Sequence, residues 1–222
     1  PERLTHLKDT GVIIARNLSE WSEPRPALGI VASNTGRHAA DALEALAHGL
    51  DLLVEKPLAV TAEEAARIRE AAAKAGRRVV VGCVLRFSES LNTFRRLLDR
   101  VGTLHSVAIE CRAYLPEWRT ARPYRETYSA RADEGGVLRD LIHDVDYAGW
   151  LFGWPSAVYA RLRNLRRLAI EAEEMAELSW ETPQGAIVSI GLDYLTRPSR
   201  RHMVASGERG TLAWRWLEGT VT

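Results

Sequence analysis

Several features that mark specialised classes of protein are absent from the 222-residue sequence. It has no apolar run near the roughly 20 residues of a membrane-spanning helix, and no recognisable signal peptide. Its two cysteines, Cys83 and Cys111, match no disulfide or zinc-ligand spacing, so we expect two reduced thiols and no metal site. Its formal net charge of +1 gives no general attraction to nucleic acids or membranes. These absences favour a cytoplasmic protein without nucleic-acid or membrane partners.

One glycine motif is also missing. The sequence contains no G-x-G-x-x-G, the turn that lets backbone N–H groups approach a dinucleotide pyrophosphate. It begins at Pro1 rather than at a methionine and stops at Thr222 within a strand-like run, so we expect a fragment of a longer gene product. The remaining composition, 46% hydrophobic and 27% charged, is typical of a globular protein with one large or two small domains.

Short apolar runs alternate with amphipathic helices over the first hundred residues. The expected strands are 11–15, 28–32, 50–54 and 78–81, and the expected helices are 37–48, 61–75 and 88–101. A capping box, Thr61 with Glu64, opens the second helix, and Gly76 ends it. Strands that alternate with helices predict a parallel sheet with right-handed crossovers, an α/β arrangement.

The pattern changes after about residue 102. Alternating apolar and polar residues predict a half-buried strand over 106–113, and further strands near 156–163, 174–182, 186–195, 202–206 and 211–217. A helix is expected over 138–152, after an irregular loop over 114–136. We therefore predict a second, α+β domain with a mainly antiparallel open sheet, with the domain boundary at residue 102.

The residues Glu55, Lys56 and Pro57 follow directly on the apolar run 50–54. Ligands bind at the carboxyl ends of the strands in open α/β sheets, so this turn is a candidate site. A lysine that is partly desolvated there can act as an acid or a base. A surface ion pair before a loop explains the same residues, and both interpretations stay open.

One stripe of the helix 138–152 carries Asp140, His143, Asp144 and Tyr147, opposite an apolar stripe. Asp140 and His143 are three residues apart, so their side chains are expected to be neighbours. A carboxylate beside an imidazole can fix its tautomer, and the pair can take a proton from a substrate hydroxyl. The alternative, which periodicity alone favours, is a solvated charged face with a helical ion pair.

The loop 114–136 combines arginines with aromatic residues. Such a set can bind phosphates or carboxylates and stack on sugar or base rings, although an ordinary polar loop is equally consistent with it. Its members are Trp118, Arg119, Arg122, Tyr124, Arg125 and Tyr128.

Four stretches, in order along the chain, resemble the glucose–fructose oxidoreductase / inositol dehydrogenase / rhizopine-catabolism (Gfo/Idh/MocA) oxidoreductases. The stretches are residues 30–38 (with Ser33 in place of the proline of the family's T-P-N-x-x-H), 54–61 (V-E-K-P-L-A-V-T), 81–87 (V-G-C-V-L-R-F) and 135–146 (G-G-V-L-R-D-L-I-H-D-V-D). The resemblance implies a partial NAD(P)-binding Rossmann domain over 1–102. It also implies a substrate and oligomerisation domain over 103–222 that is incomplete at its C-terminus.

The resemblance also implies roles for individual residues. Lys56 would be the signature lysine near the nicotinamide of NAD or NADP, His143 the acid/base and Asp140 its partner; whether Lys56 or His143 accepts the proton stays open. The cofactor side would be lined by Ser33, Asn34, His38, Glu55, Lys56 and Pro57. The substrate side would be lined by Arg86, Trp118, Tyr124 and Asp144. The implied activity is hydride transfer from a sugar, sugar derivative or cyclitol, in a dimer or tetramer formed through the C-terminal sheet.

Two departures from the family pattern matter. Asp140 lies three residues before His143, where four is the common spacing. Some members linked to surface-sugar biosynthesis resemble this shorter form and share the stretches 114–118 and 193–198, which favours a nucleotide-linked or acidic sugar as the substrate. Without the phosphate loop the chain should bind dinucleotide poorly. A non-catalytic sugar- or nucleotide-binding module and an oligomerisation scaffold therefore remain as alternative functions.

Overall fold

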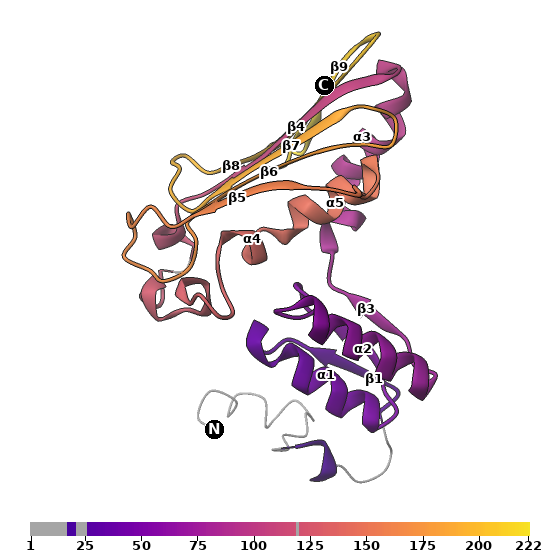
Figure 1. Cartoon of the computed structure of the whole chain (residues 1–222), viewed down its shortest axis with the longest axis vertical. Helices are drawn as coiled ribbons and strands as arrows, with labels where there is room; N and C mark the ends of the chain where they lie inside the picture. Colours follow the sequence, from indigo (N-terminus) through magenta and orange to yellow (C-terminus); the bar gives the residue numbers. More distant parts are fainter. Residues whose placement is uncertain (1–16, 21–25, 119) are drawn as a thin grey trace.

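The computed structural model describes residues 17–20, 26–118 and 120–222. The strand expected over residues 11–15 lies outside them. Figure 1 shows a small α/β part below and a large sheet above, with helices α4 and α5 between the two. Within the described residues, no helix combines the length and the apolar character needed to cross a membrane.

The first sheet is parallel, as predicted, with strand order β1-β2-β3. Its strands are β1 (Leu28–Val31), β2 (Asp51–Val54) and β3 (Val79–Val81), and its helices are α1 (His38–Ala47) and α2 (Ala62–Ala75). Alternate strand residues and the helices share one core, which includes Val31, Leu52, Val54 and Ile68. The carboxyl ends of the strands therefore point in one direction, toward α4 and α5 (Figure 1).

The capping box predicted for α2 is present. The Thr61 side chain accepts a hydrogen bond from the backbone N–H of Glu64 (3.2 Å), and the Glu64 carboxylate accepts one from the backbone N–H of Thr61 (3.4 Å). Gly76 ends the helix in the left-handed conformation at φ 62°. Two otherwise unpaired donors of the first turn are thus satisfied locally.

Replacing Thr61 with alanine should lower the free energy of unfolding by about 1 kcal/mol, because the first turn of α2 loses its side-chain acceptor. Urea denaturation followed by circular dichroism measures the change. Thr61→Ser keeps the hydroxyl and serves as the matched control. Equal stability of the alanine variant and the wild type would show that the box contributes nothing.

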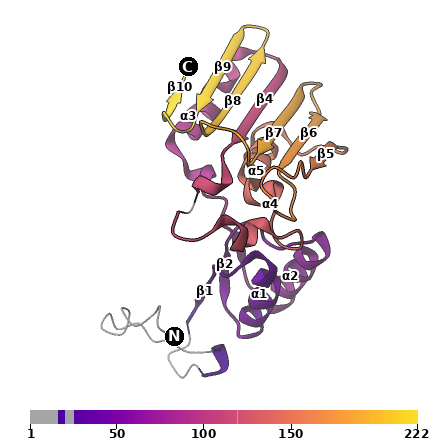
Figure 2. The same cartoon turned by 90° about the vertical axis from the view of Figure 1, so that its left-hand side faces the viewer.

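The second sheet has seven strands in the order β10-β9-β8-β4-β7-β6-β5, and Figure 2 shows them side by side. All neighbours are antiparallel except β4 and β7, which are parallel. The strands are β4 (Leu104–Arg112), β5 (Tyr159–Arg163), β6 (Met175–Glu181), β7 (Ile187–Asp193), β8 (Arg200–Gly207), β9 (Gly210–Arg215) and β10 (Thr220–Val221). The predicted mainly antiparallel sheet is confirmed.

Helices α3 (Glu89–Leu97), α4 (Val137–Asp140) and α5 (Ile142–Phe152) cover one face of this sheet (Figure 1). The core beneath them contains alternate residues of the strands, among them Ile109, Ile190 and Met203. Short 3-10 turns complete the described elements: η2 (Leu18–Glu20), η3 (Thr35–Arg37), η4 (Val84–Phe87), η5 (Leu98–Val101), η6 (Leu115–Glu117), η7 (Tyr124–Glu126) and η8 (Tyr128–Ala130).

Two details differ from the expected elements. The helix expected over 138–152 is broken at Leu141, where φ is −99° and ψ is 24°, so α4 and α5 are separate helices. The core under the second sheet begins at Leu85, and the last residue packed on the first core is Val79. Helix α3 therefore packs with the second sheet rather than closing the first domain.

Candidate active site

Lys56 joins the two parts of the molecule. It follows β2 at the carboxyl end of the first sheet, and its peptide bond to Pro57 is cis. Its ammonium group donates a hydrogen bond to the main-chain oxygen of Asp140 at 2.7 Å. Because Asp140 is the last residue of α4, the Glu-Lys-Pro turn lies against the break between α4 and α5.

The loops beside this turn are held by His38. The imidazole is buried, with Nδ1 2.8 Å from the Pro57 oxygen and Nε2 3.0 Å from the Ser33 oxygen. Two loops that end neighbouring strands are thereby tied together. Because His38 is buried, it would influence a cofactor only by holding these two loops in place. Asn34 and Glu55 are exposed at the same edge of the first sheet.

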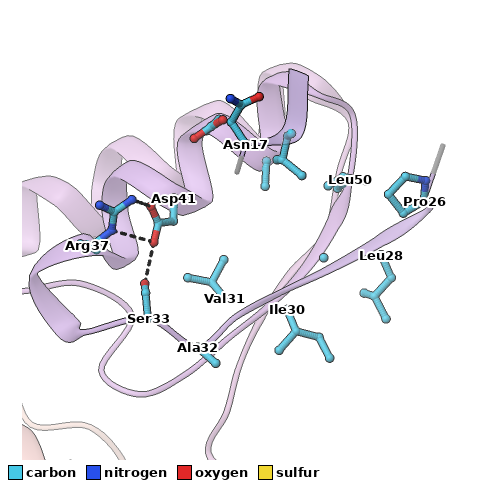
Figure 3. Close-up of a pocket in the computed structure, with 14 residues that line it drawn as sticks. Asn17, Pro26, Leu28, Ile30, Val31, Ala32, Ser33, Arg37, Asp41 and Leu50 are labelled. Carbon is cyan, nitrogen blue, oxygen red and sulfur yellow. Dashed lines mark hydrogen bonds and ion pairs between the residues drawn. The ribbon is translucent and has the colours of Figure 1, made fainter. Parts of the chain in front are cut away.

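A hollow of about 640 Å³ runs along the edge of β1 that pairs with no described strand. Figure 3 shows Ser33, Arg37 and Asp41 at one end of it; Asp41 accepts hydrogen bonds from Ser33 (2.6 Å) and Arg37 (2.7 Å). A carboxylate does not favour a pyrophosphate, and the sequence has no glycine-rich loop. The Asp41 carboxylate, paired with Arg37, thus leaves this hollow without a cradle for a pyrophosphate, and the roles of Ser33, Asn34 and Lys56 beside the nicotinamide stay predictions.

His143 stands in the first turn of α5 and is partly buried. The pKa of its imidazole falls to about 4, chiefly because of burial and also because of the positive charges of Lys56 and Arg201, which outweigh the opposing effect of Asp146. The imidazole is therefore neutral at pH 7. Its Nδ1 atom is buried without a hydrogen-bond partner in the described part of the chain. Buried polar atoms are normally paired, so this unpaired nitrogen marks His143 as a candidate functional residue.

Asp140 does not turn toward His143 as its spacing suggested. Its carboxylate accepts a hydrogen bond from the hydroxyl of Tyr194 at 2.6 Å. The break at Leu141 interrupts the continuous helix on which the expected contact with His143 depended. Tyr194 is fully buried, and the ring of Trp118 packs edge-on against it at 5.3 Å between centroids. Asp140 thus contributes its carbonyl to Lys56 and its carboxylate to Tyr194.

Asp144 is fully buried and does not reach a substrate surface, contrary to its predicted role. Its carboxylate accepts a hydrogen bond from Tyr147 (2.7 Å) and pairs with Arg201 (3.2 Å). The alternative of a solvated charged face is also wrong, because Asp140, Asp144 and Tyr147 are all buried.

Arg201 and Tyr194 were not predicted as site residues. Arg201 occupies an inward position of β8, and Tyr194 continues the inward positions of β7 one residue beyond its end. A charged or hydroxylated residue at such a position is the signal in the sequence that marks both.

The remaining predicted substrate residues make structural contacts. Arg86 forms two hydrogen bonds to Asp146, at 2.8 and 2.7 Å, and so ties η4 to α5. The Tyr124 hydroxyl donates to the Leu168 oxygen at 2.9 Å. Arg119 lies outside the described residues. Their roles toward a substrate stay predictions.

The neutral state of His143 predicts a pH dependence of stability. The unfolded chain binds a proton at the ordinary value of 6.5, but the folded protein does so only near 4, so stability should fall as the pH drops from 6.5 to 4. Urea midpoints across this range test the sign. The dependence should flatten in His143→Gln and persist in His105→Gln, which changes an exposed histidine. An unchanged slope in the first variant would contradict the assignment.

Two family models match the chain in succession. Residues 2–83 match the oxidoreductase family with an NAD-binding Rossmann fold. Residues 91–213 match the GFO/IDH/MocA C-terminal domain. The division between the two matches falls close to the division between the two hydrophobic cores.

Individual relatives agree with these matches. The chain is 32% identical over 170 residues to inositol 2-dehydrogenase 2 of Saccharopolyspora erythraea, covering 72% of this chain and 46% of the relative. It is 28% identical over 164 residues to an inositol 2-dehydrogenase of Burkholderia ambifaria, with the same coverage of 72% and 46%. The chain thus spans about half the length of these curated relatives.

Solved structures show the same fold. The WlbA dehydrogenase from Bordetella pertussis, in complex with NADH and UDP-GlcNAcA, superposes with a TM-score of 0.78 at 26% identity, covering 88% of this chain and 57% of that one. GenD2 from gentamicin A biosynthesis, in complex with NAD, gives a TM-score of 0.83 at 24% identity, covering 97% and 62%. The chain belongs to the Gfo/Idh/MocA family of NAD-binding oxidoreductases.

Proposed function

We propose that this protein is an NAD(P)-dependent dehydrogenase that oxidises a hydroxyl-bearing carbon of a sugar, sugar derivative or cyclitol. The observation that carries the proposal is the 2.7 Å hydrogen bond from Lys56 to the Asp140 oxygen. This hydrogen bond places the Lys56 ammonium, at the end of the parallel sheet, beside the break between α4 and α5. His143 is the second residue of α5. The charge of Lys56 also lowers the pKa of His143, so a cation and a neutral base lie near each other, as the removal of a hydroxyl proton requires.

Bound NAD(P)⁺ would supply the hydride acceptor. The neutral His143 accepts the proton of the substrate hydroxyl, and the Lys56 ammonium polarises its oxygen. A hydroxyl whose carbon is losing hydride becomes strongly acidic, so an imidazole with a pKa of about 4 suffices as the base. Asp140 positions the lysine through its carbonyl oxygen, and Tyr194 holds Asp140 in turn.

A nucleotide-linked or acidic sugar is the substrate we favour. WlbA, a structural relative, was solved with UDP-GlcNAcA, whereas the curated relatives are inositol 2-dehydrogenases. Support comes from the stretches 114–118 and 193–198, which meet beside Asp140: the Leu115 N–H donates to the Tyr194 oxygen at 3.0 Å. NADH formation with UDP-GlcNAcA and with myo-inositol, each supplied with NAD⁺, tests the choice. If only myo-inositol is turned over, the choice of a nucleotide-linked or acidic sugar is wrong. If neither compound is turned over, the result counts against the proposed activity.

A non-catalytic binding module is the second candidate, because the sequence lacks the phosphate loop. Titrating NADH into the 222-residue chain and following nicotinamide fluorescence separates the two. Binding of NADH supports the dehydrogenase. Binding of a sugar nucleotide without NADH supports the module.

We also propose that a second copy covers the face of the seven-stranded sheet opposite the helices. Charged residues from four strands form an ion-pair network there, in which Arg112 pairs with Asp193 (2.9 Å), Glu177 (3.3 Å) and Glu110 (3.4 Å), and Arg200 pairs with Glu110 (2.8 Å). Light scattering should give the mass of a dimer or tetramer. A monomer at all concentrations would contradict this.

A further inference from the structure

Arg201 is a charged residue on the helix-covered face of β8. It pairs in register with the buried Cys111, and the next two residues on the same face of β8, Met203 and Ala205, are fully buried. Its Nε donates to the Cys111 sulfur at 3.2 Å, and its Nη2 lies 3.2 Å from the Asp144 carboxylate. The guanidinium is thus held at two points under α5.

Asp144 connects this cation to the first turn of α5. The residue before that helix, Leu141, provides no side-chain cap. The first turn is held instead through Asp144, whose two carboxylate oxygens contact Tyr147 and Arg201. Since His143 is the neighbouring residue in the same turn, any movement of Asp144 moves the imidazole.

Packing alone does not account for this pair. The attraction within a buried ion pair often does not exceed the cost of removing both charges from water. Apolar residues of similar size in the same place often give a protein that is equally stable. The charges that face His143 come from three elements: Lys56 after β2, Arg201 on β8 and Asp146 on α5. Arg201 is therefore both a mechanical support of the turn and part of the electrostatic surroundings of the imidazole.

We propose that Arg201 is a positioning residue, which grips Asp144, fixes the first turn of α5 and presents His143 beside Lys56. Its importance for turnover rests on the proposed function. Its effect on His143, through Asp144, does not rest on the proposed function and can be measured without cofactor or substrate.

The test follows the imidazole of His143 by NMR titration in the 222-residue chain, with the signal assigned from His143→Gln. In the wild type it should titrate near pH 4. The double variant Arg201→Gln/Asp144→Asn removes both charges but keeps the size and polarity of the side chains. In it the pKa of His143 should rise above 4 but stay below 6.5, because burial and Lys56 still act on the imidazole, whereas Arg201→Lys, which keeps the cation, should hold it near 4.

A merely structural role would lower stability and leave the His143 titration unchanged in the double variant, and that result would overturn the proposal. A second measurement needs no variant: the Nε–H proton of Arg201 should exchange with solvent far more slowly than that of exposed Arg122. Equal exchange rates would also overturn it. Absence of turnover with a normal titration would count against the proposed function only.

Discussion

Replacing Lys56 with methionine should reduce kcat/KM by about 10³-fold while the protein stays folded. Among the described residues of the first sheet and its loops, Lys56 is the only cation that lies at the break between α4 and α5. A positioned acid or polarising group of this kind contributes typically about 10²–10⁴-fold to the rate. Methionine keeps the length of the side chain and loses only the charge and the donor.

The cost to stability should be small, because a single hydrogen bond to a carbonyl oxygen contributes about 1 kcal/mol. Lys74→Met is the matched control, since Lys74 is exposed at the end of α2 and far from the candidate site in sequence. Steady-state kinetics on the protein with a substrate that it turns over measures the effect. Full activity of Lys56→Met would remove the lysine from the mechanism.

Replacing Arg201 with methionine should lower the free energy of unfolding by about 3–5 kcal/mol at pH 7. The change leaves the Asp144 carboxylate fully buried beside no cation, and breaking a buried pair from one side carries a cost of this size. Burial raises the pKa of Asp144, so the loss should shrink as the pH falls and the carboxyl takes up a proton. Urea denaturation at pH 7 and pH 5 measures both effects.

Two further variants make this result specific. Arg201→Met/Asp144→Leu removes both charges and should recover most of the lost stability, because the effects of two residues in contact are not additive. Arg67→Met changes an exposed arginine on α2 and should cost less than about 1 kcal/mol. A loss in the double variant as large as in the single variant would show that the pair is not the cause.

The parts of the fold that the sequence predicted depend on residues close together in the chain. Thr61 and Glu64 lie within one helical turn, and the glycine that ends α2 is the next residue after it. The alternation along β7 needs only the strand itself, and Val188, Ile190 and Leu192 are all buried as predicted. The Lys56 turn was placed correctly for the same reason, because a parallel sheet fixes where its strands end.

The site was predicted less completely because its partners are distant in the sequence. Spacing alone put Asp140 beside His143, but Tyr194, 54 residues away, binds the carboxylate, and Leu141 breaks the helix between them. Arg201 meets Asp144 across two elements whose packing no local pattern reveals. Helical periodicity therefore placed Asp140, His143 and Asp144 on one stripe but could not reveal the neighbours that Asp140 and Asp144 have in the structure.

Transfer of deuterium tests the central claim most directly. The protein is incubated with NAD⁺ and a substrate deuterated at the carbon that carries the hydroxyl, and the nicotinamide product is analysed by mass spectrometry. The proposed function predicts deuterium on the reduced nicotinamide, formed about 10³-fold more slowly in Lys56→Met. Bound sugar and bound cofactor without any transfer of deuterium would contradict it.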